Sequence, residues 1–228
     1  MREPVRFAVV GEGRDEHGTS SQGPSLRPLS EKVLRGGLVT LVERLLRERF
    51  GRVAVPVGWL PPLKDRRSQP PKAVELLADG NLLTRLLNEL LRPVRRLPPS
   101  WPAAELVVLS VDGDRRQAFE RALSRVPQEL QDRVIPLVFE PELEVLFTRG
   151  KEPLEDACGL PRCSSGHPER QGDLKQCLGR WLQRYGGGRH LDASLRQDIA
   201  KHLDVGSESP LQEVPAFQSL IARLAWWE

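Results

Sequence analysis

Acidic side chains follow three stretches of the chain that have the composition of buried β-strands. They are Glu12, after residues 5–10; Asp112 and Asp114, after residues 105–111; and Glu142 and Glu144, after residues 133–139. The carboxyl ends of parallel strands meet at one edge of a sheet, where loops leave room for a ligand. Mg²⁺ prefers one or two protein carboxylates together with water and phosphate oxygens. The spacing therefore predicts a site for Mg²⁺, or Mn²⁺, that is suited to phosphate chemistry.

Ordinary structural roles compete with metal binding for some of these acids. Asp114 precedes a predicted helix at residues 115–125 and could cap its N-terminus. Glu142 and Glu144, with Glu140, could form the solvated first turn of a helix, where acidic side chains suit the helix dipole. Glu12 lies between two glycines, where no capping role is evident and the backbone can approach a ligand closely. The prediction of a metal site depends on the joint pattern of these acids.

The elements that would position the acids alternate along the chain. Short runs of apolar and β-branched residues predict strands at residues 5–10, 52–59, 105–111 and 133–139. Apolar residues at helical spacing predict helices at residues 30–50, 72–91, 115–125 and 140–147. This order of strand–helix–strand–helix–strand–helix–strand predicts an α/β fold, a sandwich with a parallel sheet.

Single residues mark several boundaries of these elements. Ser30 is expected to cap the first helix, and Gly51 is expected to end it. The second helix is expected to break near Asp79. Pro56 lies inside the second strand, which predicts an edge position or an early end for that strand. Residues 14–29 show no periodicity, and we expect them to form an exposed loop.

The chain divides by composition into three parts. Residues 1–150 hold the predicted α/β domain, residues 151–172 are a linker or insertion rich in Cys, Gly and Pro, and residues 173–228 form a helical extension of three helices. The extension is expected to cover one side of the sheet or to form a small cap. Within it, residues 217–227 predict a helix that either docks on its own domain or presents its aromatic end to a partner.

Composition excludes several classes of protein. Of the 228 residues, 39% are hydrophobic and 29% are charged, which is ordinary for a folded globular protein. No run approaches the ~18 apolar residues of a membrane span, and no signal-peptide core follows the first residues. Three cysteines form no even disulfide framework. We therefore expect a cytoplasmic protein with no membrane partner, and a net charge of +3 identifies no partner by itself.

Two of the acidic motifs resemble those of the Toprim family. Residues 9–16 (VVGEGRDE) resemble the first Toprim motif, and residues 109–114 (LSVDGD) resemble the second. The Toprim fold occurs in primases, topoisomerases, recombination factors and OLD-type nucleases. The resemblance implies Mg²⁺-dependent making or breaking of nucleic-acid phosphodiesters. It also implies that Glu12 is the acid/base or metal-binding glutamate and that Asp112 and Asp114 are metal-binding aspartates.

The nearer likeness is to a small, stand-alone bacterial Toprim-like family, similar to OLD nucleases, that is encoded next to ATPases in defence loci. Residues 142–147 (ELEVLF) and 173–175 (DLK) are similar to that family's later motifs. The resemblance implies an ATPase partner protein and a role for Lys175 in neutralising charge in the transition state, although an ordinary surface lysine is the alternative. The long loop after Glu16 and residues 151–172 depart from the pattern. Tyr185, the one tyrosine, is not placed as a nucleophile, so hydrolysis by water is favoured.

Two further groups of residues could bind ligands. A Zn²⁺ site is one interpretation of Cys158, Cys163, His167 and Cys177, and reduced thiols in a variable loop are the other. Contacts to the phosphates of a nucleic acid are one interpretation of Arg14, Lys64, Arg66, Arg67 and Arg115, and solvated surface charges are the other. The chain has no Walker loop, no Gly-x-Ser-x-Gly elbow and no His-Glu-x-x-His. An ATPase would therefore be a separate chain.

Two functions remain in view from the sequence. The first is a metal-dependent nuclease that acts on DNA or RNA, alone or as the effector of an ATPase-containing anti-phage defence system. The second is a non-catalytic Toprim-like binding or scaffold subunit of such a complex. Either could form a homo-oligomer. The combination of Glu12, Asp112 and Asp114 favours the nuclease.

Overall fold

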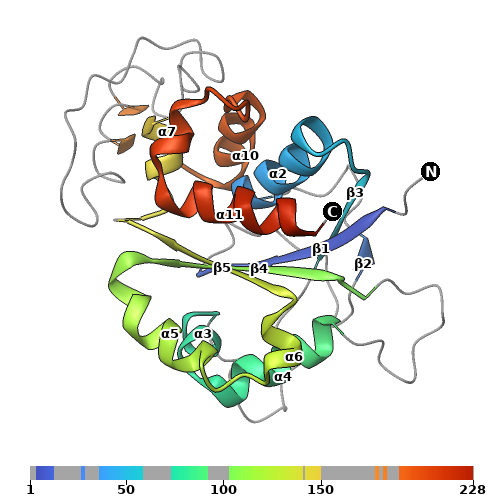
Figure 1. The fold of residues 1–228 in the computed structure, drawn as a ribbon. Helices are drawn as coiled ribbons and strands as arrows, with labels where there is room; N and C mark the ends of the chain where they lie inside the picture. The colour runs from blue at the N-terminus through green and yellow to red at the C-terminus, as the bar shows by residue number, and fades with distance from the viewer. Residues whose placement is uncertain are drawn as a thin grey trace.

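The computed structural model describes residues 4–12, 27–28, 36–58, 73–91, 103–140, 142–149, 178–179, 182–183 and 190–227. A twisted sheet lies at the centre, with the strand order β2-β3-β1-β4-β5. The strands are β1 (Val5–Val10), β2 (Arg27–Pro28), β3 (Ala54–Gly58), β4 (Leu106–Asp112) and β5 (Val134–Phe139). Strands β3, β1, β4 and β5 are parallel, and β2 pairs antiparallel with β3. The protein is therefore an α/β protein built on a parallel sheet (Figure 1).

Helices connect the parallel strands and follow the last of them. They are α2 (Gly37–Arg44), α3 (Ala73–Ala78), α4 (Gly80–Leu91), α5 (Arg116–Leu123), α6 (Gln128–Gln131), α7 (Val145–Arg149), α10 (Ala193–His202) and α11 (Pro215–Trp226). The described residues also form the π-helical η1 (Leu45–Arg49) and the 3₁₀-helical η2 (Gly113–Arg115) and η3 (Pro210–Glu213). In the part of the chain that the structure describes, no helix is long and apolar enough to cross a membrane.

The two faces of the sheet bury separate hydrophobic cores because side chains alternate along each strand. Val5, Phe7 and Val9 of β1 lie in the core beneath α2, α10 and α11, which we call the first face. Ala8 and Val10 lie in the core against α3, α4, α5 and α6, which we call the second face. Figure 1 shows these two layers of helices on opposite sides of the sheet. Burial on both faces explains why the strands read as continuous apolar runs.

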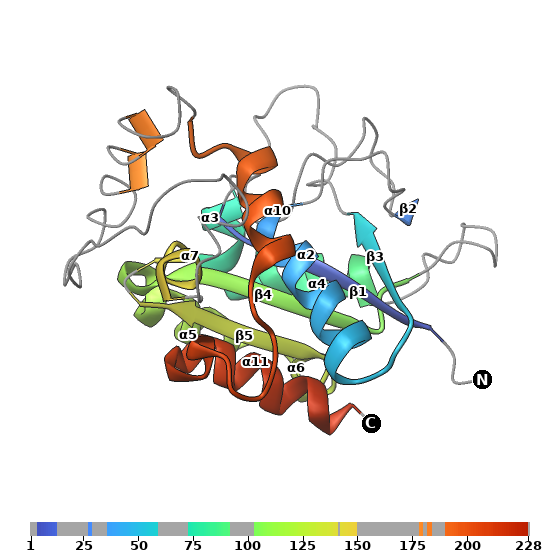
Figure 2. The ribbon, with the colours of Figure 1, turned by 90° about the horizontal axis from the view of Figure 1, so that it is seen from above.

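Residues 190–227 belong to the core of the first face. Figure 2 shows α10 beside α2, and α11 along the edge strand β5. Phe217, Leu220 and Leu224 of α11 are buried in the same core as the odd-numbered side chains of β1. The prediction that this terminal helix docks on its own domain is confirmed, although Trp226 at its end is 77% exposed. The helical extension therefore completes the hydrophobic cover of the sheet.

Most of the predicted elements are confirmed. All four predicted strands are present within two residues of their expected ends, and the predicted break separates α3 from α4 at Asp79. The Asp79 carboxylate accepts hydrogen bonds from the N–H groups of Asn81 (2.8 Å) and Leu82 (3.3 Å), as an N-cap does. Gly51 follows the end of η1 with a φ of 60°, which favours glycine.

Some local predictions need correction. The segment 14–29 was expected to be a loop, but it contains β2, whose two residues pair with Val57 and Gly58 of β3. Strand β3 is therefore not at the edge, although only this short β2 lies outside it. Helix α6 was not expected at all. Ser30, the expected cap of the first helix, lies outside the described residues.

Candidate functional site

The ends of β1 and β4 are joined by a hydrogen bond that involves two of the predicted site residues. The two strands are adjacent and parallel, with Val10 in register with Leu109. Just beyond this register, the Oε1 atom of Glu12 accepts a hydrogen bond from the backbone N–H of Asp112 at 3.0 Å. The sheet thus brings together two acids that were predicted to share a site.

Asp112 also connects the end of β4 to the segment that follows β5. It is the last residue of β4, pairs with Phe139 of β5, and is 8% exposed. Its Oδ1 atom accepts a hydrogen bond from the backbone N–H of Leu143 at 3.1 Å. The structure therefore places the ends of all three acid-bearing strands at one edge of the sheet, which we call the strand-end site: Glu12, Asp112 and residues 142–144.

Residues 142–144 form a tight turn that leads into α7. The backbone carbonyls of Glu142, Leu143 and Glu144 accept hydrogen bonds from residues 145, 146 and 147 at 3.0, 3.1 and 2.9 Å. The side chains of Glu142 and Glu144 are both 1% exposed. The interpretation of these two acids as a solvated first turn is therefore wrong. Glu140 is exposed and its carboxylate pairs with Arg116 at 2.7 Å, but it precedes α7, which begins at Val145, and does not lie in the first turn of that helix.

Glu144 is paired with a residue that the sequence analysis did not identify. Its Oε1 atom lies 2.6 Å from Nη2 of Arg196 in α10, and the two side chains are 1% and 5% exposed. Arg196 also donates a hydrogen bond from Nη1 to the carbonyl of Leu191 at 2.6 Å. A signal for this residue was present in the sequence. Arg196 falls on the apolar stripe of α10 at helical spacing from Ala193, Ala200 and Leu203.

Gly37 lets three helices meet beside this ion pair. It is the first residue of α2. A Cβ atom at this position would lie 3.2 Å from the carbonyl oxygen of Arg196 and 3.3 Å from Cζ of Phe147 in α7. These distances are tighter than ordinary van der Waals contact. Glycine therefore allows α2, α7 and α10 to pack closely where the Glu144–Arg196 pair is buried.

Asp114 lies at the surface next to the strand-end site. Its side chain is 42% exposed, and its Oδ2 atom lies 3.6 Å from Nε of Arg115, which is 52% exposed. No side-chain cap is formed at the start of α5, so the alternative role of Asp114 as a helix cap is not supported. Asp114 and Arg115 thus present a carboxylate and a guanidinium to solvent immediately after Asp112.

The donor atoms of the strand-end site suit Mg²⁺ in their chemistry. Among the residues that the structure describes, no three His, Cys, Asp or Glu side chains lie close enough to hold one ion together. Asp112 and Glu144 instead bind groups of the protein, the N–H of Leu143 and the guanidinium of Arg196. Glu12 and Asp112 nevertheless supply the one or two carboxylates that Mg²⁺ takes beside water and phosphate oxygens. The residue types therefore fit this ion.

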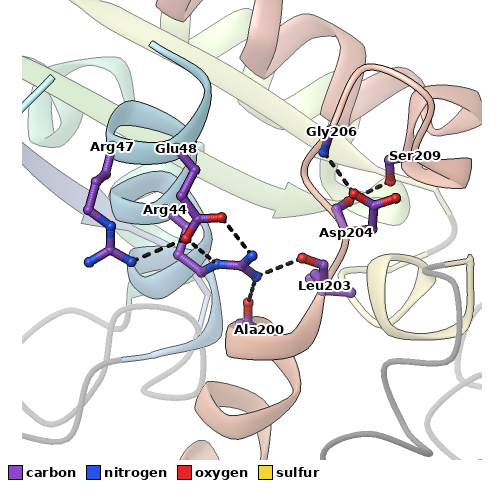
Figure 3. Close-up of polar contacts among 8 residues, drawn as sticks. All are labelled: Arg44, Arg47, Glu48, Ala200, Leu203, Asp204, Gly206 and Ser209. Atoms are coloured by element: carbon purple, nitrogen blue, oxygen red, sulfur yellow. Dashed lines mark hydrogen bonds and ion pairs between the residues drawn. The ribbon is translucent and has the colours of Figure 1, made fainter. Parts of the chain in front are cut away.

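A second polar cluster lies at the other end of α10. Arg44 of α2 donates from Nη1 to the carbonyls of Ala200 (2.9 Å) and Leu203 (2.6 Å), and from Nε and Nη2 to both carboxylate oxygens of Glu48 (Figure 3). Beside it is a pocket of about 360 Å³ whose lining includes Arg49 and Ser207. Arg44 satisfies carbonyls at the C-terminus of α10 that no helical N–H can reach. This cluster therefore fastens α10 to α2.

The other predicted site residues lie outside the described residues. They are Lys175, the proposed zinc ligands Cys158, Cys163, His167 and Cys177, and the basic residues Arg14, Lys64, Arg66 and Arg67.

Comparisons with protein-family models, with curated proteins and with solved structures found no match to this chain.

Proposed function

We propose that this chain is a metal-dependent nuclease that hydrolyses nucleic-acid phosphodiesters. The supporting observation is the pair of hydrogen bonds that joins three strand ends, from the Asp112 N–H to Glu12 and from the Leu143 N–H to Asp112. Acids that lie far apart in the sequence are gathered at the carboxyl edge of a parallel sheet. That edge is where open α/β folds bind ligands.

We infer that the sheet is a Toprim-like core. Two features support this inference: a Glu-Gly pair after β1, and an Asp-x-Asp that begins at the last residue of β4. These two strands are neighbours at the middle of the parallel sheet. In such a core Glu12 would be the acid/base or metal-binding glutamate, and Asp112 and Asp114 would be the metal-binding aspartates.

The acids of the strand-end site would have different roles in hydrolysis. Glu12 and Asp112 would hold Mg²⁺ together with water and phosphate oxygens, because no three acids of the described residues lie close enough to share one ion, and Glu144 is engaged by Arg196. A bound Mg²⁺ supplies electrostatic stabilisation of the charge that develops on the phosphate. Glu12 is only half-buried, and the Asp112 N–H orients its carboxylate. It is therefore suited to take a proton from the attacking water.

The surface beside the site would receive the nucleic acid. Arg115 is exposed next to Asp114, and a guanidinium there can contact a phosphate of the backbone. We also propose that an ATPase partner, supplied as a separate chain, controls the activity in anti-phage defence. That part of the proposal depends on the resemblance of residues 142–147 and 173–175 to a family encoded next to ATPases.

The test is a cleavage assay with matched variants. The purified chain is incubated with supercoiled plasmid, single-stranded DNA and RNA in Mg²⁺ or Mn²⁺, beside Asp112→Asn and Glu140→Gln. Asparagine keeps an oxygen that can accept from the Leu143 N–H, so the fold should persist. Glu140 is a matched control because its carboxylate is exposed and pairs with Arg116. We expect Asp112→Asn, which removes a charged metal ligand, to lower the rate by about 10²-fold or more, and Glu140→Gln to leave it unchanged; equal cleavage by both would contradict the proposal.

A non-catalytic binding or scaffold subunit is the second candidate. It is favoured by the engagement of Asp112 and Glu144 with groups of the protein, and by the lack of a three-ligand cluster in the described residues. Cleavage measured with the ATPase supplied separates the two candidates. A scaffold, whose acids hold a structural cation or none, would cleave no nucleic acid under those conditions.

A further inference from the structure

Arg196 is anchored firmly in the first turn of α10. Asp192 caps this helix, since its Oδ1 atom accepts from the N–H of Leu195 at 2.9 Å. The backbone N–H of Arg196 donates to the Asp192 carbonyl at 3.0 Å, and its Nη1 donates to the Leu191 carbonyl. Arg196 is thereby held by hydrogen bonds from both its backbone and its side chain. These bonds fix the position from which its guanidinium contacts Glu144.

A buried ion pair at this position is not explained by stability alone. Removing a guanidinium and a carboxylate from water costs several kcal/mol per ion, and a well-packed apolar pair is often as stable. The positions around Arg196 on α10 are apolar, namely Ala193, Ile199 and Ala200. An apolar residue would therefore serve for packing at residue 196. What the charged pair adds is a fixed direction for the Glu144 carboxylate.

The ion pair is the first link of a continuous series of bonds that ends at β1. Glu144 belongs to the turn 142–144, whose Leu143 N–H donates to Oδ1 of Asp112 at 3.1 Å. The N–H of Asp112 in turn donates to Glu12 at 3.0 Å. A change in the position of Glu144 would therefore move the Leu143 N–H and alter the orientation of the Asp112 carboxylate.

We propose that Arg196 is a positioning residue of the strand-end site, which orients the Asp112 carboxylate through Glu144 and the Leu143 N–H. This inference rests on the proposed function, because it assigns Arg196 a task in holding the cation-binding acids. Arg196 itself is 4% exposed, and its guanidinium binds the carboxylate of Glu144. Its action is therefore through Glu144.

The experiment compares Arg196 with Arg44, because both arginines hold α10 and they do so at opposite ends. Arg44 binds the carbonyls of Ala200 and Leu203 at the C-terminal end of α10, and the carboxylate of Glu48 (Figure 3). Arg196→Met, Arg196→Lys and Arg44→Met are measured for Tm, for Mn²⁺ affinity by electron paramagnetic resonance, and for hydrogen exchange at the Leu143 amide. Asp112→Asn identifies the Mn²⁺ that belongs to the site.

We expect both Met variants to be less stable than the unaltered chain, and we expect only Arg196→Met to bind Mn²⁺ more weakly. Both should lower Tm. Arg196→Met should weaken Mn²⁺ binding by about 10- to 100-fold, as the loss of an outer-shell partner typically does, and should speed exchange at Leu143. Arg196→Lys should recover part of the affinity because it keeps the charge. Arg44→Met should bind Mn²⁺ like the unaltered chain.

A double variant keeps the test decisive if Arg196→Met does not fold. Arg196→Met with Glu144→Leu replaces the ion pair by an apolar pair and should restore Tm, while Mn²⁺ affinity stays low. Full Mn²⁺ affinity in this double variant, or in a folded Arg196→Met, would overturn the positioning role and leave the nuclease proposal intact. Absence of any Mn²⁺ bound through Asp112 in the unaltered chain would overturn both.

Discussion

The backbone N–H of Asp112 donates a hydrogen bond to the carboxylate of Glu12 at 3.0 Å, across 100 residues of sequence. The donor belongs to the main chain of Asp112, so the bond can form with any residue except proline at this position. It also leaves the Asp112 carboxylate to its contact with the Leu143 N–H. A substitution of the Asp112 side chain can therefore remove its carboxylate and still leave the hydrogen bond that orients Glu12.

Glu12→Gln should remove activity without unfolding the protein. Glutamine keeps an Oε1 atom that accepts from the Asp112 N–H, so we expect a small change in the free energy of unfolding, within about 0.5 kcal/mol. It cannot accept a proton, and loss of a general base typically lowers the rate by 10²–10⁴-fold. Cleavage rate and urea unfolding measured on the same preparation check this. A variant that cleaves at the full rate would remove Glu12 from the acid/base role.

Gly80→Ala should destabilise the protein through the second face of the sheet. A Cβ atom at Gly80 would lie 2.7 Å from Cβ of Arg125 and 3.0 Å from the Ala122 carbonyl, so α4 would have to move away from α5. We expect a loss of about 1–3 kcal/mol in the free energy of unfolding. Gly179→Ala is the matched control, because nothing lies within 4 Å of that position. Equal stabilities of the two variants in urea would contradict the close approach.

Phe217→Ala should show how much α11 contributes to the first face. Phe217 is 1% exposed, and removal of a buried phenyl ring typically costs 3–5 kcal/mol. Trp226→Ala, on the same helix, removes a ring that is 77% exposed, and should change stability by no more than about 0.5 kcal/mol. Thermal unfolding of both variants tests this, and a larger loss at Trp226 would show that its ring is covered in solution.

Glu48 should make the contact between α2 and α10 sensitive to acid. The hydrogen bonds from Arg44 hold the pKa of Glu48 below its ordinary value, against the opposing effect of partial burial, and Arg47 adds to the lowering. Because the folded-state pKa is depressed, the stabilisation is present above the ordinary Glu pKa of about 4.3 and is lost as the pH falls through the lowered value.

The measurement is Tm against pH for the unaltered chain and Glu48→Gln. We expect the variant to lose less Tm between neutral pH and about pH 3. The difference should shrink in high salt, because the Glu48 side chain is 37% exposed and solvent screens the pair. Glu208→Gln, at another exposed carboxylate, provides the control. Parallel curves for Glu48→Gln and the unaltered chain would show that the Arg44–Glu48 pair does not contribute.

The strands were predictable because both faces of the sheet are buried. Val107 and Val108 lie on opposite faces and are both fully buried, so β4 is an unbroken apolar run that ends at an acid. Strand β2 was not predictable from the sequence. Its two residues are assigned to a strand because they pair with β3, and two residues are too few to show a periodic pattern. Pro56 predicted an edge position or an early end for this strand, and the edge position is wrong because β2 pairs with β3 on its outer side.

The sequence identified acids that the strand-end site contains, but it did not predict the hydrogen bonds and the ion pair that these acids make. Period and residue type identified Glu12 and Asp112, because each acid follows an apolar strand. Burial of Glu144 depends on Arg196, which lies 52 residues further along the chain. A local pattern contains no information on such a partner, so the solvated interpretation of Glu144 was reasonable and wrong.

The two cores of the sheet draw on different lengths of chain, and this sets an order for folding during synthesis. Among the described residues, the buried members of the core of the second face all lie between residues 8 and 134. The core of the first face needs Leu195 to Leu224 as well. While the ribosome is still making residues 193–226, the apolar side chains of β1, β4 and β5 on that face have, among the described residues, α2, η1, residues 143–147 and the buried Leu178 and Leu182 to cover them. We expect the nascent chain to need a chaperone at this stage, because exposed apolar surface on a partly folded sheet promotes aggregation.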